Sequence, residues 1–320
     1  MALLEVENLK AYYMTSRGAV KAVDDVSFTL DRGESLGLAG ESGCGKSTLG
    51  FSLINLLPPP GRIVGGSIKI DGIEVVGMPE PELRRRVRWT KISMIFQGAM
   101  NSLNPVYTIG RQLAEPLVYH KGMSWDDAVS KAKEYLELVG LEPNIVKRYP
   151  HELSGGMKQR AVIAMALLEE PDLVIADEPT TALDVIVQAQ ILNLLKKLKW
   201  QLDLSIIIIS HDLAVISELA DKLAIMYAGK IVEIGPSDRV YLNPMHPYTR
   251  KLLGAIPRLH QKQERLEFIP GAPPNLIHPP PGCRFHPRCP ERLEPCDREE
   301  PELVEVEPGH WVACHLYSRR

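Results

Sequence analysis

The chain has 320 residues, of which 45% are apolar and 24% are charged, and its formal net charge is −3. This length suits two domains, or one domain with large additions, and the apolar fraction can form a normal core. The slightly acidic balance disfavours a nucleic-acid binder that depends on broad positive charge. No stretch reaches the ~18 apolar residues of a membrane span, and MALLEVENLKAYY lacks the features of a signal peptide, so we expect a cytoplasmic location.

The first part of the chain has short segments with β-strand character, separated by glycines, such as VSFTL and SLGLAG. The second of these segments leads directly into GESGCGKST, which spans Gly40 to Thr48 and fits the phosphate-loop pattern G-x-x-x-x-G-K-[ST]. The alternative is a glycine-rich turn that matches by chance, which the strand before it makes less plausible. We therefore predict a nucleotide phosphate site at this loop.

The chemistry of phosphate binding explains these residue types. Glycines let the backbone curl so that its N–H groups converge on phosphate oxygens, and the positive end of the following helix adds to the attraction. Lys46 would reach the β- and γ-phosphates, and the Ser47 hydroxyl would bind Mg²⁺. Cys44 fits as a small loop residue, although a thiol at a helix start could be acidified and oxidisable. The predicted loop residues are Gly40, Ser42, Gly43, Cys44, Gly45, Lys46, Ser47 and Thr48.

Helices are predicted for much of the range from about 100 to 170. In SWDDAVSKAKEYLELVG, Ser124 can cap the helix, Asp127 occupies the capping-box position and Gly140 can end it. The apolar runs DLVIAD and LSIIIIS follow, and they are typical of strands buried on both faces of a parallel sheet. Because VIVQAQILNLLKKLKWQ between them predicts a helix, we expect a right-handed βαβ unit.

An acidic pair ends the first of these apolar runs. Asp177 would hold Mg²⁺ directly or through water, and Glu178 would act as general base on the attacking water. An isolated Asp-Glu pair at a strand end is more often a solvated turn. Its combination with the phosphate loop favours the catalytic interpretation.

The composition changes after a predicted hairpin, LAIMYAGKIVEIG, with its turn at Ala228 and Gly229. Beyond Pro236 the chain becomes rich in proline, as in PGAPPNLIHPPPGC. We place a domain boundary there, with one domain over 1–235 and a second over 236–320.

Five motifs in order now carry a family resemblance. HELSGGMKQR resembles the signature motif of ATP-binding-cassette (ABC) ATPases, and it is accompanied by a glutamine loop in IFQGAMNSLNP, the Walker B strand LVIADEP, the D-loop TALD and the switch histidine in IISHD. The resemblance covers residues 1 to about 236. It implies an α/β P-loop NTPase fold, with a mixed-sheet core and a helical subdomain at about 98–168.

The resemblance also implies roles for single residues. Tyr13 would stack on adenine, with Tyr12 as the alternative, and His211 would hydrogen-bond the γ-phosphate. Gln97 would contact Mg²⁺ and the attacking water. Asp184 would couple the two sites of a dimer. Ser154, Gly155 and Gly156 would cap the γ-phosphate bound by the opposite subunit, which suits a helix start with open N–H groups.

MNSLNP, MHPYTRKLLGAIP and the cysteine-rich tail resemble the ATP-binding subunits of dipeptide and oligopeptide importers. This branch implies two transmembrane permease subunits, a second ATPase that is a copy or a paralogue, and indirectly an external solute-binding protein. It places the chain peripherally, on the cytoplasmic face of the cell membrane. In the glutamine loop, Gly98 and Ala99 replace the acid and proline that the family more often has, which implies a changed loop backbone.

Four of the five cysteines lie close together in the tail: Cys283, Cys289, Cys296 and Cys314. Their spacing fits neither common zinc pairs nor the usual ferredoxin patterns, so spacing alone indicates only that four soft ligands could converge. The importer resemblance implies a [4Fe–4S] cluster on these four cysteines. The alternatives are Zn²⁺, with His286, His310 or His315 as substitute ligands, and free packed thiols.

Other functions remain as alternatives. Similar importers carry oligosaccharides or nickel, and the substrate cannot be read from this chain. A non-transport ABC ATPase acting on DNA or ribosomes is disfavoured, because too few residues separate Lys46 from Ser154 for a long coiled coil and there is one phosphate loop. A redox protein with an incidental ATPase fold is disfavoured by the complete set of motifs.

Overall fold

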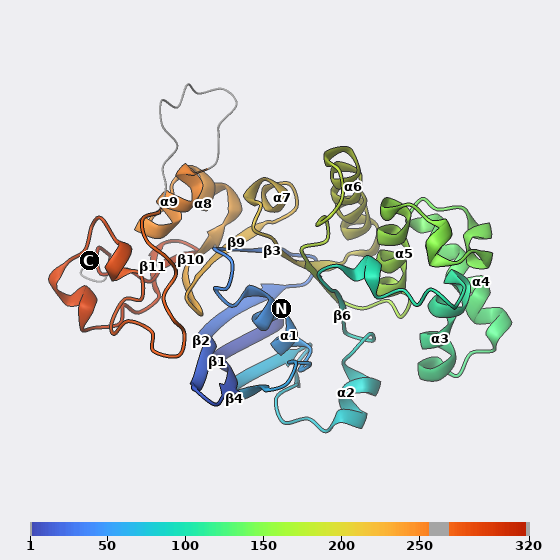
Figure 1. Ribbon diagram of the computed structural model, residues 1–320, viewed down its shortest axis with the longest axis horizontal. Coiled ribbons are helices and arrows are strands. Elements are labelled where there is room, and N and C mark those ends of the chain that lie inside the picture. Colours follow the sequence, from blue (N-terminus) through green and yellow to red (C-terminus); the bar gives the residue numbers. More distant parts are fainter. Residues whose placement is uncertain (1, 256–268, 318–320) are drawn as a thin grey trace. The chain divides into compact units, whose positions relative to one another are not determined.

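The computed structural model describes residues 2–255 and 269–317. The chain forms two compact units, and each is assembled from segments that lie far apart in the sequence (Figure 1). The first unit comprises Met1–Leu4, Asp31–Glu34 and Lys69–Ile208. The second unit comprises Glu5–Leu30, Ser35–Ile68 and Ile209–Arg320.

Parallel strands form the centre of the first unit. Strand β6 (Ile92–Ile95) pairs with β7 (Leu173–Asp177), so that Ile92 lies opposite Leu173, and β8 (Ser205–Ile209) is the next neighbour of β7. Every residue of β7 and β8 is buried. The two apolar runs are therefore strands buried on both faces, as the sequence predicts.

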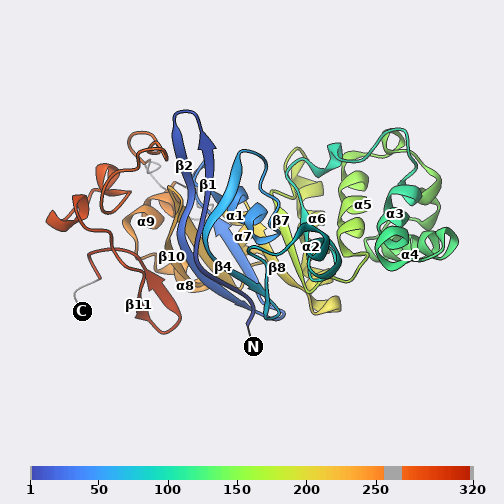
Figure 2. The same cartoon turned by 90° about the horizontal axis from the view of Figure 1, so that it is seen from below.

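Helices make up the rest of the first unit. They are α2 (Glu80–Arg86), α3 (Ile109–Lys121), α4 (Trp125–Leu138), α5 (Gly155–Leu167) and α6 (Val185–Leu202), with a short strand β5 (Ile73–Glu74) and single turns at Ala99–Asn101, Pro143–Lys147 and Pro150–Glu152. Helices α3, α4 and α5 lie side by side (Figure 2). Since α6 connects the neighbouring strands β7 and β8, the predicted order of strand, helix and strand is confirmed, and its right-handedness stays a prediction.

The predicted caps of α4 are also confirmed. The hydroxyl of Ser124 accepts the N–H of Asp127 at 3.2 Å, and Gly140 adopts a left-handed φ of 75° just after the helix. Among the described residues, no helix combines the length and the apolar character that crossing a bilayer requires.

The second unit contains a small sheet and the phosphate loop. Strands β2 (Gly18–Asp31), β1 (Ala2–Thr15) and β4 (Gly61–Ile70) are neighbours in that order. Strand β3 (Ser35–Ala39) pairs in parallel with β9 (Lys222–Tyr227), and β9 forms an antiparallel hairpin with β10 (Lys230–Pro236). Ala228 and Gly229 both have positive φ, which confirms the predicted turn. The helices are α1 (Lys46–Leu53), α7 (Leu213–Ser217), α8 (Ser237–Leu242) and α9 (Pro247–Gly254).

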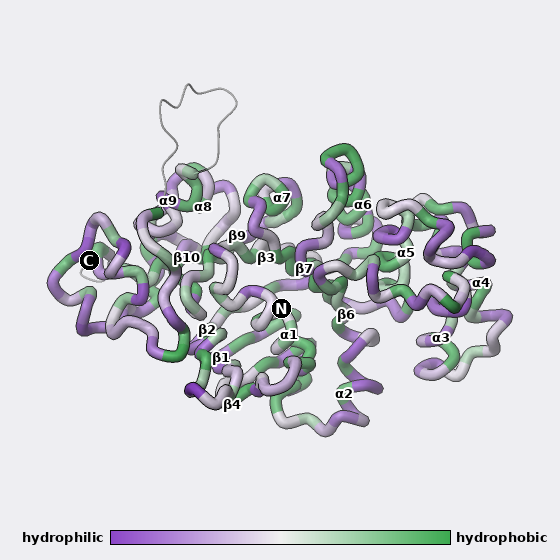
Figure 3. The backbone as a smooth tube through the Cα atoms, in the orientation of Figure 1, coloured by the Kyte–Doolittle hydropathy of each residue, from purple (hydrophilic) through white to green (hydrophobic). Residues whose placement is uncertain are grey.

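The tail extends the hairpin by two short strands. Strand β12 (His310–Val312) pairs with β10, and β11 (Val304–Glu307) pairs with β12. The rest of the described tail is irregular, with single turns at His286–Arg288 and Glu294–Asp297, and it is largely hydrophilic (Figure 3). Its apolar cluster is small and centres on Met245, Val312 and Cys314. The boundary at residue 236 stays a prediction, since β12 joins a strand that precedes it.

A buried carboxylate ties the tail to the hairpin. Glu233 on β10 accepts hydrogen bonds from the backbone N–H groups of Met245 and His246 at 2.8 and 2.9 Å. Nε2 of His310 lies 2.8 Å from the same carboxylate, and the side chains of Glu233 and His310 are both fully buried. A buried carboxylate with several donors holds these donors firmly in place. This network holds the first two residues of MHPYTR, Met245 and His246, against β10.

Candidate functional site

The phosphate loop curls back on itself in the second unit. It follows β3 and ends in α1, whose first residue is Lys46. Nζ of Lys46 donates to the carbonyl oxygens of Gly40 at 2.8 Å and Glu41 at 3.0 Å, so its ammonium group lies across the loop. The apex, Ser42 and Gly43, is exposed. This geometry presents one cation and a helix start to the same space, as a phosphate site requires.

The glycines of the loop are required by its shape. Gly45 has a φ of 109°, and a Cβ there would lie 1.9 Å from the carbonyl oxygen of Ala22. A Cβ at Gly40 would lie 2.2 Å from the carbonyl oxygen of Met226. No other residue type fits either position without moving the backbone.

The Cys44 thiol of the loop is buried. Burial raises its pKa, and this effect outweighs the ammonium group of Lys46, which lowers it. Burial therefore favours the neutral thiol and the interpretation of Cys44 as a small loop residue. The carbonyl oxygen of Cys44 accepts the N–H of Gly229 at 2.8 Å, so Cys44 anchors the loop to the β9–β10 turn.

Two tyrosines of β1 differ in their partners. The hydroxyl of Tyr13 lies 3.4 Å from Oγ1 of Thr48, in the first turn of α1. The hydroxyl of Tyr12 donates to the carboxylate of Asp24 instead. Tyr13 is thus the tyrosine beside the phosphate loop, which favours it over Tyr12 for stacking on a base. His211 lies in the same unit, exposed, between β8 and the N-cap of α7.

The first unit brings Gln97 and Glu178 together. Parallel strands end at the same edge of a sheet, and these two residues follow the neighbouring strands β6 and β7. Nε2 of Gln97 donates to Oε2 of Glu178 at 2.8 Å, and Oγ1 of Thr181 donates to the same oxygen at 3.0 Å. Asp177 ends β7 with 1% of its surface exposed. Glu178 has a φ of 47°, a strained conformation that often occurs at functional sites.

The signature motif and the D-loop also lie together in the first unit. Ser154 caps α5 and accepts the N–H of Met157 at 3.3 Å, while Asp184 caps α6 and accepts the N–H of Val187 at 2.9 Å. A Cβ on Gly156 would lie 2.8 Å from Val187, and one on Gly155 would lie 3.5 Å from Leu183. The glycines let the two helix starts approach each other and leave the first N–H groups of α5 accessible to an anion.

None of the four tail cysteines forms a disulfide bond with another residue that the structure describes, and each sulfur has a backbone N–H donor. The donors are Phe285, Glu291 and Leu316 for Cys283, Cys289 and Cys314, and Leu293 for Cys296 at 3.3 Å. Burial raises the pKa of Cys283 to about 12 and that of Cys314 to about 11, and the neighbouring thiols add to both shifts. Within residues 2–255 and 269–317, no group of three or more metal-ligating side chains is close enough to hold an ion.

The candidate histidines are engaged elsewhere. Nδ1 of His286 lies 2.9 Å from the carbonyl oxygen of Cys283, and Nε2 of His315 lies 2.8 Å from that of Glu299. His310 contacts Glu233, as described above. Each of these histidines therefore has one ring nitrogen committed to a protein oxygen.

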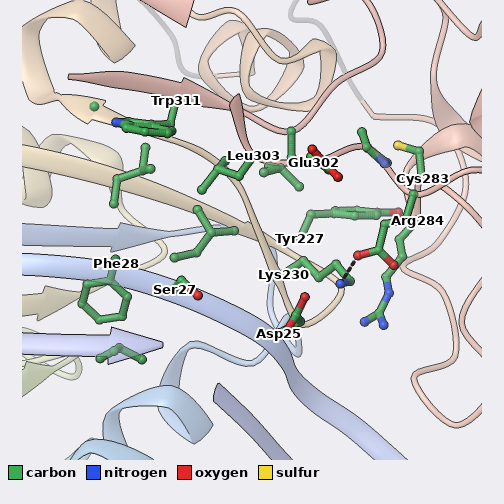
Figure 4. A pocket seen from close by; sticks show the side chains of 18 of the residues that line it. Asp25, Ser27, Phe28, Tyr227, Lys230, Cys283, Arg284, Glu302, Leu303 and Trp311 are labelled. Carbon is green, nitrogen blue, oxygen red and sulfur yellow. Dashed lines mark hydrogen bonds and ion pairs between the residues drawn. The ribbon is translucent and has the colours of Figure 1, made fainter. Parts of the chain in front are cut away.

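A cavity of about 730 Å³ lies in the second unit, apart from the phosphate loop (Figure 4). It is lined by β2, β9, β10 and the tail, with Phe28 and Trp311 at one end and Cys283 and Arg284 at the other. None of the residues from Gly40 to Thr48 lines it. The cavity is therefore separate from the nucleotide site.

Sequence reasoning missed several residues that contact the phosphate loop. Arg288 forms an ion pair with Glu41, and the Tyr248 hydroxyl accepts the N–H of Glu41 at 2.8 Å. Two sequence patterns could have drawn attention to these residues: the arginines next to tail cysteines, Arg284 and Arg288, and the motif MHPYTRKLLGAIP, which contains Tyr248. Neither pattern indicates its partner, because the partners are more than 200 residues away.

Comparisons with known proteins agree with this geometry. Residues 23–181 match the family model "ABC transporter", and residues 232–296 match "Oligopeptide/dipeptide transporter, C-terminal region". The chain is 47% identical to the dipeptide transport ATP-binding protein DppD of Bacillus subtilis, covering 99% of this chain and 96% of that protein. It is 49% identical to the oligopeptide transport ATP-binding protein OppD of Escherichia coli, covering 98% and 93%.

A solved structure extends the comparison to the fold. The ATP-binding cassette MJ0796, described as dimeric and bound to ADP and Pi, matches with a TM-score of 0.65 and 28% identity, covering 73% of this chain and 98% of that one. The mixed-sheet P-loop fold expected from the motifs is thereby confirmed. The chain belongs to the ABC ATPases, and within them to the family of dipeptide and oligopeptide transport ATP-binding proteins.

Proposed function

We propose that this chain hydrolyses ATP to drive the import of dipeptides or oligopeptides through a membrane permease. Its relatives are transport ATP-binding proteins over nearly their whole length, and the C-terminal region matches a model specific to peptide transporters. The observation that carries the catalytic part is the hydrogen bond of 2.8 Å between Gln97 and Glu178 at the end of β7. It holds a strained carboxylate in one orientation.

The phosphates would be bound by the loop from Gly40 to Thr48 and by Lys46, with Tyr13 against the base. Ser47 in the first turn of α1 and the buried carboxylate of Asp177, together with Gln97, have the oxygen ligands that Mg²⁺ prefers. When bound, Mg²⁺ neutralises charge on the β- and γ-phosphates. Glu178 would accept a proton from the attacking water as its oxygen bonds to the γ-phosphorus, while the bond from that phosphorus to the β–γ bridging oxygen breaks and ADP leaves. His211 would donate a hydrogen bond to the γ-phosphate.

A second ATPase subunit would complete each site. Ser154, Gly155 and Gly156 start a helix whose N–H groups suit an anion, and they would cap the γ-phosphate held by the partner subunit. Next to Asp184, the side chains of Val185 and Ile186 are 80% and 73% exposed, and exposed apolar residues at a helix start favour an interface there. Every motif for both halves of a site is present, so the partner can be a second copy or a paralogue.

The remaining partners would be two transmembrane permease subunits, with a solute-binding protein outside the membrane. The chain would lie on the cytoplasmic face of the membrane and bind the permeases through the loop after Gln97. In that loop Gly98 has a φ of 67° and Ala99 starts a single helical turn. Ala99 also donates its N–H to the carbonyl oxygen of Phe96 at 3.0 Å, a hydrogen bond that proline cannot make, so the loop backbone would differ from that of relatives with proline while hydrolysis is retained.

The tail would form a small accessory domain that is stabilised by a [4Fe–4S] cluster on Cys283, Cys289, Cys296 and Cys314. The support is chemical: the four thiols are buried or half-buried, neighbouring cysteines contribute to the raised pKa of Cys283, Cys289 and Cys314, and each sulfur has a backbone N–H donor. Such N–H donors stabilise thiolate ligands of a cluster. The alternative ligand is Zn²⁺. A cluster would supply the cross-links that the small apolar core of the tail cannot.

The cluster is tested by iron, sulfide and zinc analysis of the chain purified without oxygen. We expect about four irons and four sulfides per chain and a brown colour that reductant bleaches. One zinc per chain without colour would replace the cluster by a zinc site. Protein without metal would assign the four cysteines to packing.

The transport function is tested by uptake of labelled dipeptide, oligosaccharide and nickel in cells that carry wild-type protein or K46A. We expect K46A to abolish uptake of the dipeptide alone. Loss of oligosaccharide or nickel uptake would reassign the substrate. Undiminished uptake of all three, with ribosomes or DNA co-purifying in place of permeases, would support a non-transport ABC ATPase.

A further inference from the structure

Arg288 connects the cysteine-rich tail to the phosphate loop. It ends the single turn His286–Arg288, between Cys283 and Cys289. Its Nη1 and Nη2 donate to the two carboxylate oxygens of Glu41 at 2.6 and 2.9 Å, which is a two-pronged ion pair. Only 6% of the Arg288 side chain is exposed, against 23% for Glu41. Arg288 is therefore a buried cation whose principal partner is the second residue of the phosphate loop.

The rest of the arginine is fixed as well. Its Nε donates to the carbonyl oxygen of Pro270 at 2.7 Å, and Nη1 lies 3.3 Å from the hydroxyl of Tyr227. The ion pair with Glu41 is the main cause that raises the pKa of Arg288 above its usual range. The guanidinium group thus has a single orientation, set by the tail on one side and by the loop on the other.

Glu41 is held at three points. Its carboxylate meets Arg288, its N–H donates to the Tyr248 hydroxyl at 2.8 Å, and its carbonyl oxygen accepts from Nζ of Lys46 at 3.0 Å. The ring of Tyr248 packs against Tyr227 and Phe285, with centroid distances of 4.6 and 5.3 Å. Lys46, which would bind the phosphates, is therefore hydrogen-bonded to Glu41, and the position of Glu41 depends on Arg288 of the tail.

A second arginine of the tail reaches the same region. Nη1 of Arg284 donates to the carbonyl oxygen of Ala228 at 2.5 Å, and Nη2 pairs with Asp24. Ala228 precedes Gly229, whose N–H donates to the carbonyl oxygen of Cys44 in the loop. Figure 4 shows Arg284 directly beside Cys283. Both arginines that flank the first two tail cysteines thus support the phosphate loop.

The negative charge of Glu41 affects how the phosphate loop can bind ATP. A loop that must receive a polyanion contains a carboxylate at its second position, and an unpaired carboxylate there repels phosphate. We propose that Arg288 is a positioning residue for the phosphate loop: it neutralises Glu41 and holds the loop in the conformation that binds ATP. This inference rests on the proposed role of the loop in ATP binding. It gives the tail a part in nucleotide affinity.

The test measures the affinity of the full chain for Mg-ATP, with a fluorescent ATP analogue as the probe. We expect R288M to raise the Kd about 10-fold, which corresponds to about 1.4 kcal/mol at 25 °C. E41Q alone should change the Kd less than about 3-fold, and E41Q/R288M should return it to within about 3-fold of wild type, because the repelling charge is gone. R288K should lie between wild type and R288M, since lysine keeps the charge and loses the two-pronged contact.

The matched control is R292M. Arg292 is an arginine of the same tail, paired with Asp297 at 2.6 Å and without a contact to the loop, so its replacement should leave the Kd unchanged. A wild-type Kd in R288M overturns the inference. A raised Kd that E41Q does not rescue also overturns it, because damage to the tail alone predicts that result, and a thermal melt would show such damage directly. If K46A also binds ATP normally, the loop assignment itself is wrong, which is a separate failure.

Discussion

The phosphate loop and the cysteine tail differ in how the chain assembles their functional residues. The loop is one continuous stretch of nine residues, Gly40 to Thr48, in which Gly40 and Gly45 are fixed by close backbone contacts. The tail draws its four cysteines from 32 residues, Cys283 to Cys314, and its folded partners lie on β10, on the β9–β10 turn and on the loop itself. A site made of consecutive residues can be identified from its sequence motif, whereas a site made of distant residues can be identified only from the structure.

The largest expected effect comes from the acidic end of β7. We expect E178Q to lower ATP hydrolysis about 10³-fold, since glutamine cannot take a proton from water and a general base contributes on the order of 10²–10⁴. ATP binding should remain, because no phosphate ligand is removed. Phosphate release and analogue binding measure the two parts, with E137Q on the exposed face of α4 as control. Undiminished hydrolysis in E178Q would remove Glu178 from its role.

The second effect belongs to the tail. E233A removes the acceptor of two backbone N–H groups and of His310, all buried, so we expect the free energy of unfolding to fall by about 3–5 kcal/mol. Urea denaturation followed by circular dichroism measures this loss. E305A is the matched control, because Glu305 is exposed and accepts a single N–H, that of Gly309, at 2.7 Å. Its expected loss is below about 1 kcal/mol. Equal losses in both variants would show that the Glu233 network does not hold the tail.

Several elements of the fold could be predicted from the sequence alone. Strands β7 and β8, helix α4 with both of its caps, the β9–β10 turn and the phosphate loop all follow from neighbouring residues, and these predictions are confirmed or match the described geometry. The hydrogen bond between Gln97 and Glu178 was not predicted, because no strand was expected at Ile92–Ile95. The structure explains it, since the parallel strands β6 and β7 end at the same edge of the sheet.

The tail contacts could not be predicted, because their energy comes from groups brought together only by folding. Glu233 carries no signal as a buried carboxylate, since its neighbours on β10 resemble those of any hairpin strand. Arg288 has the sequence context of a solvated arginine beside two prolines. Its partner Glu41 occupies a variable position of the phosphate-loop pattern. The four cysteines were identified by residue type, and the direction of their N–H donors required coordinates.

The third effect is a dependence of stability on pH. His246 caps α9 and is fully buried, and burial lowers its pKa to about 4 from 6.5. The unfolded chain therefore binds one more proton between these values, so stability is full above pH 6.5 and falls as the pH drops toward 4. We expect this group to contribute about 2–3 kcal/mol of that loss. Nδ1 of His246 accepts the N–H of Tyr248 at 3.0 Å. In H246N an amide oxygen would accept the same N–H without titrating, so unfolding curves at pH 7 and 4.5 should differ less in H246N. Equal pH dependence in both proteins would contradict the assignment.

The smallest expected effect separates a structural cap from a catalytic one. Ser124 and Ser154 cap neighbouring helices of the first unit with the same geometry, accepting an N–H three residues on at 3.2 and 3.3 Å. Each alanine variant should lose about 1 kcal/mol of stability, the usual cost of removing such a cap. Only S154A should also lower ATP hydrolysis, about 10-fold, because the Ser154 hydroxyl would contact the γ-phosphate bound by the partner subunit. Hydrolysis by S154A should also depend more steeply on protein concentration than hydrolysis by the wild type. If S124A reduces hydrolysis as much, stability alone explains both variants, and Ser154 has no place at the nucleotide. A loss of hydrolysis in S154A alone would assign Ser154 a part in catalysis. Because Ser124 caps its helix in the same way, the difference would then come from the second subunit, whose nucleotide only Ser154 would contact.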